Sequence, residues 1–371
     1  MPTMNTRELP PRDTMLEAFL HRDDAYEGVF VTAVVTTGIF CRPTCSARKP
    51  KPKNVEFYAT PREALVAGYR PCRRCQPLRP AGAAPDWLAP LLRAVEEDPT
   101  RRWRDADLRE LGLEPARVRR WFQSHHGMTF HAYSRARRLG EAIGHIQEGS
   151  QVSRTVHEAG YESLSGFNEA LKQLAGRAPA SLEDTRVVTV KRVGTPLGQM
   201  IAGVANGNVV LLEFADRRAL PAQFERIAKR LDAVFVPGED EMLDELEAQL
   251  NAYFAGERRD FDLPLETSGT QFQEQVWAAL REIPPGTVCS YGDVAAAIDR
   301  PTATRAVARA NGDNRIAILI PCHRVIGSDG SLTGYGGGLW RKKRLLEVEG
   351  LSALADGTYP LGEAHRQTEL L

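Results

Sequence analysis

The hydrophobic pattern changes its period along the chain, beginning with a stretch that favours a β-strand. Residues 31–40 are mostly β-branched or apolar, and this run predicts one strand that ends at Cys41. After a linker marked by Pro77, Pro80, Gly82 and Pro85, the apolar residues recur at helical spacing instead. The change indicates that a mixed α/β region precedes an all-helical one.

The helical stretch contains two similar units. Residues 107–111, a turn at Gly112 and residues 115–126 predict two helices joined by a tight turn. A long helix over 130–147 follows, and the arrangement then repeats up to residue 174. Helix-turn-helix units joined in this way predict a domain whose second helices can each enter a DNA major groove.

One alternative is a helical bundle whose arginines only face water. The second unit departs from a DNA-reading pattern, because residues 167–174 carry one basic residue together with Glu169. The sequence therefore favours base contacts by the first unit over the second.

The pattern then returns to strands and ends in a further group of helices. Strands are predicted where apolar residues alternate or run together, at 187–193, 198–204 and 209–214, with helices at 221–231 and 242–255. Beyond residue 270 the chain predicts an amphipathic helix and a third helix-turn-helix, over 293–298 and 302–310. Cys289 and Tyr291 are expected on a strand just before it.

Length and charge add to this picture. A chain of 371 residues exceeds one ordinary domain and predicts about two to four. The net charge is zero, but residues 36–80 hold ten Lys or Arg against two Asp or Glu, and residues 232–247 hold seven acidic residues and no basic one. This separation suits a protein that places only some of its faces on a polyanion.

The N-terminus shows no signal peptide, because charged residues between Arg7 and Asp13 interrupt any apolar run, and no segment reaches transmembrane length. We therefore expect a cytoplasmic protein without a membrane partner. In a reducing compartment, six cysteines favour metal binding or reactivity over disulfides.

Four of the cysteines form two close pairs, Cys41 with Cys45 and Cys72 with Cys75. Two such pairs supply four soft ligands for one tetrahedral Zn²⁺. The alternative interpretation is a zinc site with a purely structural role, since most all-cysteine sites are structural. The lysines and arginines that surround the pairs favour, in addition, contact with a DNA backbone.

A fifth cysteine lies in the stretch Pro321-Cys322-His323-Arg324-Val325, which places a thiol beside a base and a cation. Nucleophilic cysteine chemistry needs a thiolate, and neighbouring histidine and arginine favour that form. An inert buried cysteine is the alternative interpretation of such an apolar run.

Three blocks resemble the signature of the O6-alkylguanine-DNA alkyltransferases: residues 321–325, the preceding Ser290-Tyr291-Gly292-Asp293 and the following Gly334-Tyr335-Gly336-Gly337-Gly338. The resemblance implies a ribonuclease-H-like lobe that acts as scaffold, followed by a winged-helix-like catalytic lobe. It also implies that Cys322 accepts the alkyl group, that His323 takes the thiol proton through a water, and that Glu349 orients the histidine.

The same resemblance assigns roles in DNA contact. Arg305 is implied to enter the base stack in place of an extruded guanine, and Tyr291 to contact the phosphate that rotates. Asn314 is implied to be the hinge between the third helix-turn-helix and the active site. Tyr335 is implied to roof the pocket.

The N-terminal motifs, residues 36–45 and 68–75, resemble the zinc domain of the Ada family, and the helical region resembles AraC-type activators. This resemblance implies that Cys41 is both a zinc ligand and the acceptor of a methyl group from a DNA methylphosphotriester. Cys45, Cys72 and Cys75 would complete the zinc site. The positions that we expect to touch the DNA backbone are Thr37, Arg48 and Arg70.

The sequence thus predicts a multidomain chain of α/β and all-α units. Its predicted domains are a zinc-bound α/β domain (1–80), an AraC-type double helix-turn-helix domain (85–183), a ribonuclease-H-like lobe (187–266) and a winged-helix-like alkyltransferase lobe (270–355). The predicted function is single-turnover repair of O6-methylguanine and methylphosphotriesters, coupled to transcriptional regulation. One Zn²⁺, structural and nucleophile-activating, is expected, with no organic cofactor.

The expected partners are double-stranded DNA, both alkylated and promoter DNA, and RNA polymerase, with the chain acting as a monomer. Two other functions stay open at this point. One is a zinc-containing AraC-type regulator with a non-catalytic alkyltransferase-like lobe, which the presence of Cys322, His323 and Glu349 disfavours. The other is a metabolic sulfur methyltransferase, which is disfavoured because no glycine-rich cofactor loop follows a strand.

Overall fold

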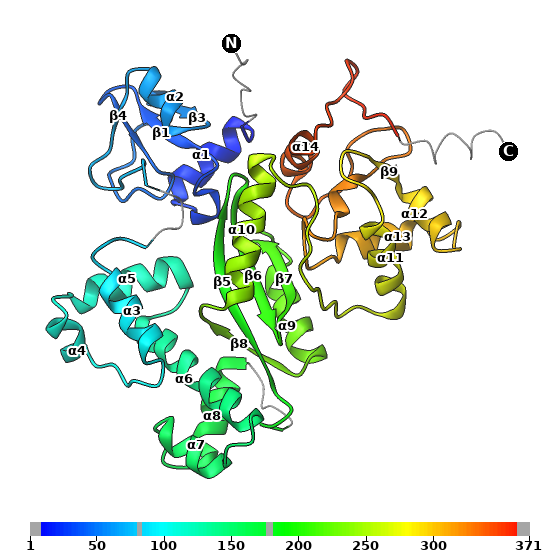
Figure 1. The fold of residues 1–371 in the computed structure, drawn as a ribbon. Helices are drawn as coiled ribbons and strands as arrows, with labels where there is room; N and C mark the ends of the chain where they lie inside the picture. The colour runs from blue at the N-terminus through cyan, green and yellow to red at the C-terminus, as the bar shows by residue number, and fades with distance from the viewer. Residues whose placement is uncertain (1–8, 80–83, 176–180, 362–371) are drawn as a thin grey trace.

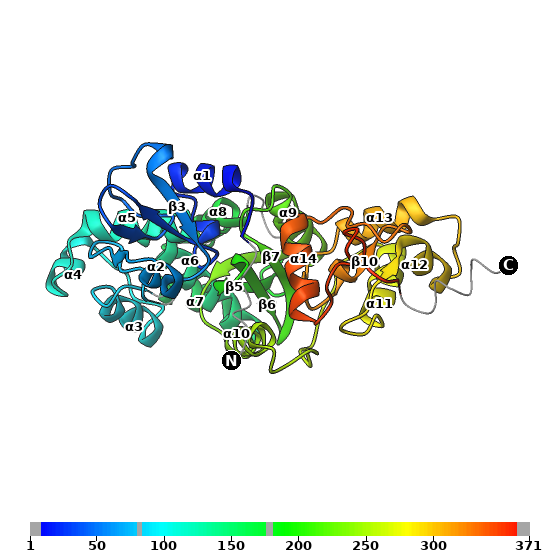
Figure 2. The same ribbon diagram turned by 90° about the horizontal axis from the view of Figure 1, so that it is seen from above.

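The computed structural model describes residues 9–79, 84–175 and 181–361 and arranges them in four regions (Figure 1). The N-terminal region and the helical region lie on one side of a central sheet, and the last lobe lies on the other side in both views (Figure 1 and Figure 2). Residues 80–83, which belong to the predicted linker, lie outside the described residues.

The N-terminal region is built on a four-stranded sheet of order β3-β1-β2-β4. Its elements are α1 (Arg12–His21), β1 (Val31–Val34), β2 (Ile39–Cys41), β3 (Val55–Tyr58), α2 (Pro61–Val66) and β4 (Arg70–Pro71). The single strand predicted over residues 31–40 is wrong, because a turn at Gly38 (φ +64°) folds this run into the β1–β2 hairpin. The turn was not predicted because the two threonines before Gly38 continue the β-branched pattern of the strand into it.

The helical region contains α3 (Ala89–Glu97), α4 (Asp105–Glu110), α5 (Pro115–His126), α6 (Phe130–Gln147), α7 (Val152–Glu158) and α8 (Leu164–Ala175). The two predicted helix-turn-helix units are α4 with α5 and α7 with α8, and α6 connects them. Phe122 lies 5.0 Å from the rings of both Phe130 and Tyr133, measured between centroids. This aromatic cluster fixes α5 against α6.

The central lobe contains β5 (Arg186–Thr195), β6 (Gly198–Ala205), β7 (Asn208–Phe214), α9 (Leu220–Arg230), β8 (Ala233–Pro237) and α10 (Glu241–Ala255). The strand order is β7-β6-β5-β8, and β8, which is not among the predicted strands, runs parallel to β5. Val234 and Val236 of β8 share an apolar cluster with Leu139 of α6 and Phe167 of α8. The second helix-turn-helix unit therefore packs on this lobe.

The last lobe contains α11 (Gln271–Arg281), β9 (Cys289–Ser290), α12 (Tyr291–Ala297), α13 (Thr304–Gly312), the 3-10 turn η3 (Cys322–Arg324), β10 (Val325–Ile326) and α14 (Leu339–Val348). Tyr291 was expected on a strand but begins α12. The cause is a capping box, in which the Ser290 hydroxyl accepts from the Asp293 amide at 3.1 Å and the Asp293 carboxylate accepts from the Ser290 amide at 2.7 Å. One apolar core joins this lobe to the central sheet.

The N-terminal region also contacts the central lobe, where the Arg192 guanidinium lies 2.7 Å from the Asp24 carboxylate. Within the described ranges, no helix combines the length and the apolar character that a membrane span requires.

Candidate active sites

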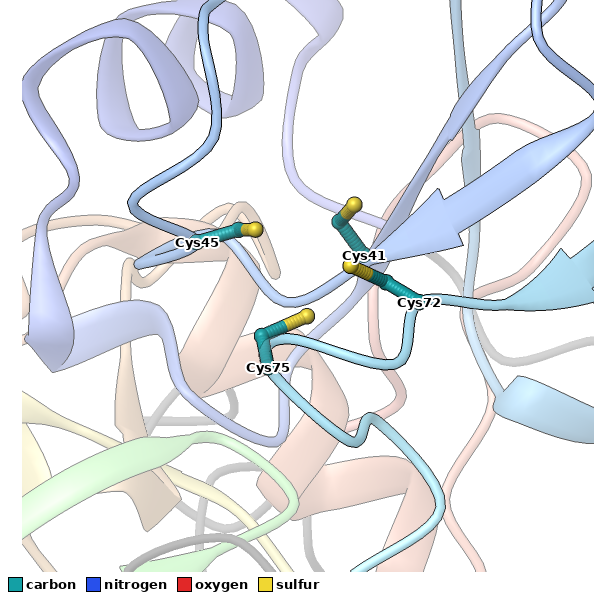
Figure 3. A group of neighbouring side chains, drawn as sticks. All are labelled: Cys41, Cys45, Cys72 and Cys75. Carbon is teal, nitrogen blue, oxygen red and sulfur yellow. The ribbon is translucent and has the colours of Figure 1, made fainter.

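Four cysteine thiols meet where the N-terminal sheet ends (Figure 3). Cys41 is the last residue of β2 and Cys45 lies in the loop after it, while Cys72 and Cys75 follow β4. The parallel pairing of β2 with β4 brings the two pairs together, since the Cys72 amide donates to the Phe40 carbonyl at 2.9 Å. All four sulfur atoms lie within 4.8 Å of one another.

This donor set fits zinc. Zn–S bonds of about 2.3 Å in a tetrahedron place the sulfur atoms roughly 3.8 Å apart, and four thiolates without an oxygen donor suit a soft metal. Arg42 fastens the two halves of the site, because its Nε donates to the Cys75 carbonyl at 3.0 Å and its Nη1 to Glu27 at 2.8 Å. Contacts within the protein therefore help to hold the loops that carry the four cysteines.

A cavity of about 420 Å³ opens beside Cys41. Thr37 and Arg48, two of the residues expected at DNA, are exposed and line it, whereas Arg70 is exposed on β4 and does not. Lys49 also lines the cavity, and its ammonium lies 3.7 Å from the centroid of the Phe19 ring. Burial lowers the pKa of Lys49 to about 8. The cavity thus combines three of the four cysteines, Cys41, Cys45 and Cys72, with several cations, which suits a phosphate ester.

Cys322 lies far from this site in the chain, at the start of η3 in the core of the two C-terminal lobes. The Asn314 amide donates to its sulfur atom at 3.1 Å and to the Ile320 carbonyl at 2.9 Å. Burial raises the pKa of the Cys322 thiol, and the hydrogen bond from Asn314 acts in the opposite direction. Asn314, predicted as a hinge, therefore touches the thiol itself.

His323 and Glu349 are fully buried and in contact, with 2.9 Å between His323 Nε2 and Glu349 Oε1. Glu349 caps the end of α14 and also accepts from Tyr253 at 2.9 Å and from Arg324 Nη2 at 2.8 Å. Burial alone would raise the pKa of Glu349, but His323 and Arg324 outweigh it and hold that pKa well below the usual range. A charged carboxylate therefore faces the histidine.

Burial lowers the pKa of His323, which keeps the imidazole neutral, and Glu349 opposes this shift. With Nε2 directed at the carboxylate, Nδ1 has no hydrogen-bond partner in the described part of the chain. The ring thus has one nitrogen held by an acceptor and the other able to take a proton.

A second cavity of about 420 Å³ reaches Cys322. Tyr291 and Tyr335 line it from opposite segments, and the Tyr291 hydroxyl lies 3.5 Å from the Gly334 carbonyl. Arg305 does not line the cavity but is exposed on α13, three residues before Ala308, which does. The structure therefore brings all the predicted residues of this site together except Arg305, which lies on the adjoining helix surface.

Two cavity residues come from the central lobe, for which the family resemblance implies only a scaffold role. Glu213 is the charged residue in the otherwise apolar end of β7, and Arg217 follows in the next turn. A lone carboxylate within an apolar strand was the one sequence signal that could have identified Glu213. No local pattern distinguished Arg217 from its neighbour Arg218.

Four family models match the chain in order: the metal binding domain of Ada at residues 14–77, a helix-turn-helix domain at 108–184, and the ribonuclease-like and DNA binding domains of 6-O-methylguanine DNA methyltransferase at 210–267 and 271–351. The bifunctional transcriptional activator/DNA repair enzyme Ada of Escherichia coli is 36% identical over 351 residues, which cover 91% of this chain and 96% of that protein. The regulatory protein ada of Salmonella typhimurium is 35% identical over 358 residues, which cover 88% and 94%. A crystal structure of O6-methylguanine methyltransferase from Mycobacterium tuberculosis is 41% identical, with a TM-score of 0.39, over 44% of this chain and 92% of that one.

These matches confirm the predicted fold class, with a zinc-binding α/β domain, an AraC-type helix-turn-helix region and two alkyltransferase lobes. They also agree with the four-cysteine cluster in assigning zinc to the N-terminal region. Because the similarity to the Escherichia coli protein exceeds 30% identity and extends over nine tenths of the sequence, the chain belongs to the Ada family.

Proposed function

We propose that this protein repairs methylated DNA by irreversible transfer of methyl groups to Cys322 and Cys41, and that it regulates transcription in response to the same damage. The observation that carries the proposal is the Cys322 site, in which Asn314 holds the sulfur at 3.1 Å and the His323–Glu349 pair is fully buried beside it. An inert core cysteine requires neither contact. The similarity to bifunctional Ada proteins over nearly the whole length supports it further.

At Cys322 the residues have distinct tasks. His323 takes the thiol proton through a water, and Glu349 holds the opposite ring nitrogen and stabilises the imidazolium. The sulfur attacks the methyl carbon of O6-methylguanine, so that an S–C bond forms and the C–O6 bond breaks. The guanine leaves with the electron pair of that bond and regains one proton, which balances the proton given up by the thiol.

The guanine must leave the duplex before this step, because its O6 substituent is out of reach inside the base stack. Arg305, exposed on α13, takes the place of the extruded base, and Tyr291 at the cavity mouth contacts the rotated phosphate. Tyr335 covers the base from the other side. The thioether product has no leaving group at neutral pH, so the site acts once.

At Cys41 the substrate is a methylphosphotriester of the DNA backbone. Zinc held by Cys41, Cys45, Cys72 and Cys75 would keep the Cys41 thiol deprotonated at neutral pH. The cysteine sulfur attacks the methyl carbon, an S–C bond forms, the C–O bond breaks, and a phosphodiester anion leaves. Arg48 and Lys51 at the cavity receive that anion, and Thr37 and Arg70 hold the neighbouring backbone.

Promoter recognition is assigned to the helix-turn-helix region, with α5 as the principal reader. Arg119, Arg120 and Gln123 are exposed on α5, whereas the exposed face of α8 carries Glu169 and Lys172. The protein acts as a cytoplasmic monomer on double-stranded DNA, and RNA polymerase is its partner at promoters.

Intact mass and peptide mapping after incubation with methylated duplex DNA test the proposal. We expect two additions of one methyl group each, on the peptides that contain Cys41 and Cys322. A regulator with a non-catalytic lobe would add no methyl group to Cys322, and a cofactor-dependent methyltransferase would leave both cysteines unmodified.

A further inference from the structure

The segment after β7 reaches from the central lobe into the Cys322 cavity. Glu213 and Arg217 both line this cavity, and their side chains are only 1% and 10% exposed. The Arg217 guanidinium forms an ion pair with the Glu213 carboxylate. A buried pair of this kind is retained at a cost in desolvation, which points to a role beyond stability.

Arg217 also binds two backbone carbonyls of the last lobe. Its Nη1 donates to the Asn314 carbonyl at 3.1 Å, and its Nη2 donates to the carbonyl of Gly312, the last residue of α13. Gln223, itself 2% exposed, donates to the same Asn314 carbonyl at 3.2 Å. The hinge residue is thus held through its backbone by the central lobe while its side chain holds the Cys322 sulfur.

The same guanidinium packs against the glycine-rich roof of the cavity. A Cβ atom at Gly336 would come within 2.5 Å of the Arg217 Cζ atom, so the backbone of the roof lies directly on the arginine. Arg217 therefore touches the roof, the end of the DNA-binding helix α13 and the hinge at once. The roof and the end of α13 line the Cys322 cavity, and Asn314 bonds the sulfur that the cavity reaches.

The pair also sets the charge beside the thiol. Burial raises the pKa of Cys322 most strongly, the Glu213 carboxylate raises it further, and Arg217 lowers it. The other titratable groups around the thiol are Lys342, His323, Tyr291 and Tyr335. Removal of Arg217 alone would leave a buried, unpaired carboxylate next to the sulfur.

We propose that Arg217 is a positioning residue for methyl transfer to Cys322, acting by fixing Asn314 and the roof at Gly336 and by neutralising Glu213. The inference rests on the proposed function of Cys322 and assigns to the ribonuclease-H-like lobe a part in the reaction that is more than scaffold.

The experiment compares single-turnover methyl transfer from duplex O6-methylguanine in the full chain. The variants are Arg217→Met, Arg217→Lys, the double variant Glu213→Gln with Arg217→Met, and Arg218→Met as the matched control on an exposed neighbour. Rates over a range of DNA concentrations separate the dissociation constant from the maximal rate. The final number of methyl groups per chain gives the folded, active fraction.

We expect Arg217→Met to lower the maximal rate by about 10-fold to 100-fold, since misplacement of reacting groups by about 1 Å costs rates of this size. The dissociation constant and the final methyl stoichiometry should change little. The maximal rate of Arg217→Lys should lie between that of Arg217→Met and that of the unsubstituted chain, because lysine keeps the positive charge but cannot make the forked contacts of the guanidinium. The dependence of the maximal rate on pH should also shift to higher pH in Arg217→Met. In the double variant, which also carries Glu213→Gln, this shift should disappear.

A maximal rate within two-fold of the original chain in Arg217→Met overturns the inference, as does an equal loss in Arg218→Met. A loss that is explained entirely by a reduced methyl stoichiometry overturns it too, because the role would then be folding. If the unsubstituted chain places no methyl group on Cys322, the proposed function itself fails, and this outcome is distinct from the others.

Discussion

Cys41 and Cys322 are the two proposed acceptors, and their surroundings differ in almost every respect. Cys41 lies among three other thiols, at a cavity lined by Arg48, Lys49 and Lys51. Cys322 lies in an apolar core, where a side-chain amide holds its sulfur and the next residue is a buried histidine paired with a carboxylate. In the proposed function, a metal activates the Cys41 thiol and a proton acceptor activates the Cys322 thiol.

The difference follows from where each methyl group lies in DNA. A phosphotriester is on the outside of the duplex, so its acceptor can lie in a surface cavity among cations. The O6 atom of guanine is inside the stack, so its acceptor needs a closed cavity and a device that extrudes the base. The same S–C bond formation is thus served by unrelated folds, each fitted to one position of the substrate.

The sharpest test of this separation is Cys322→Ala. We expect it to abolish methyl transfer from O6-methylguanine while the zinc content and transfer to Cys41 stay unchanged, because the two sites lie in different regions of the chain. Transfer assays with each substrate, together with metal analysis, measure both effects. Restored transfer through Cys289, a half-buried thiol whose pKa burial raises to about 12, would refute the assignment.

The converse test is to remove one of the three other ligands, Cys45, Cys72 or Cys75. Replacement by alanine should release the zinc and unfold the N-terminal region, because metal binding and folding are coupled in small cysteine sites. Transfer to Cys322 should persist. Metal analysis and limited proteolysis check this, with Cys289→Ala as the control, and a folded, metal-free N-terminal region would contradict it.

The features of the fold and of the two sites that could be predicted from the sequence are those defined by residues close together in the chain. The cysteine pairs, the helix-turn-helix units and the stretch around Cys322 are local patterns, so their residues could be named from the sequence. The contact of Arg217 with Asn314 joins residues 97 positions apart, and only the packed fold creates it. No sequence pattern near either residue predicts this contact.

The fold errors have a similar cause. β8 is a five-residue strand that ends shortly before the helix α10, and it is a continuous apolar run that pairs in parallel with β5 and shows no alternation. The β1–β2 hairpin was missed because threonines continue a strand-like composition through its turn. In neither place did the local composition mark the ends of the strand, which its pairing partner sets.

A third prediction tests the proton acceptor at Cys322. Glu349→Gln should slow transfer to Cys322, because His323 loses the carboxylate that raises its pKa, and should leave transfer to Cys41 unchanged. It should also lower the free energy of unfolding of the C-terminal lobes by roughly 3 to 5 kcal/mol, since Arg324 is left buried without its partner. Glu347→Gln, at a partly exposed ion pair with Arg344, is the matched control.

The pH dependence of stability sharpens this result. The pKa values of both His323 and Glu349 are lower in the folded protein than their ordinary values of 6.5 and 4.5. The unfolded chain therefore binds more protons, and stability falls as the pH drops below about 6.5 and again below about 4.5. Denaturation of Glu349→Gln over this range should show a shallower fall at the acidic end, and an unchanged slope would contradict the pairing.

A fourth prediction concerns base extrusion, which only Cys322 requires. Arg305→Ala should reduce transfer from duplex DNA by roughly ten-fold and leave transfer from the free base almost unchanged, because the side chain fills the gap left by an extruded guanine. Arg309→Ala removes the same charge from the same exposed helix surface and is the control. Equal losses on both substrates would contradict the role of Arg305.

The last prediction links the Cys41 site to promoter binding. We predict that methylation of Cys41 raises the affinity of the protein for DNA. Four thiolates around Zn²⁺ carry a net charge of about −2, and conversion of one into a neutral thioether leaves about −1, so that one unit of repulsion toward phosphate disappears. At about 8 Å this is worth roughly 0.5 kcal/mol in a water-like dielectric and roughly 2 kcal/mol at an effective dielectric of about 20, or about two-fold to thirty-fold in affinity.

Titration of one duplex at several salt concentrations, with unmodified protein and with protein methylated only at Cys41, measures this gain. If the effect is electrostatic, the gain must shrink as salt rises, because screening weakens the repulsion that methylation removes. Protein methylated only at Cys322 is the control and should show no gain, since that sulfur is buried and away from the cations around Cys41. An unchanged or lower affinity after methylation of Cys41 would end the idea of a charge switch, whereas a gain that resists salt would assign it to a rearrangement of the N-terminal region instead of to charge.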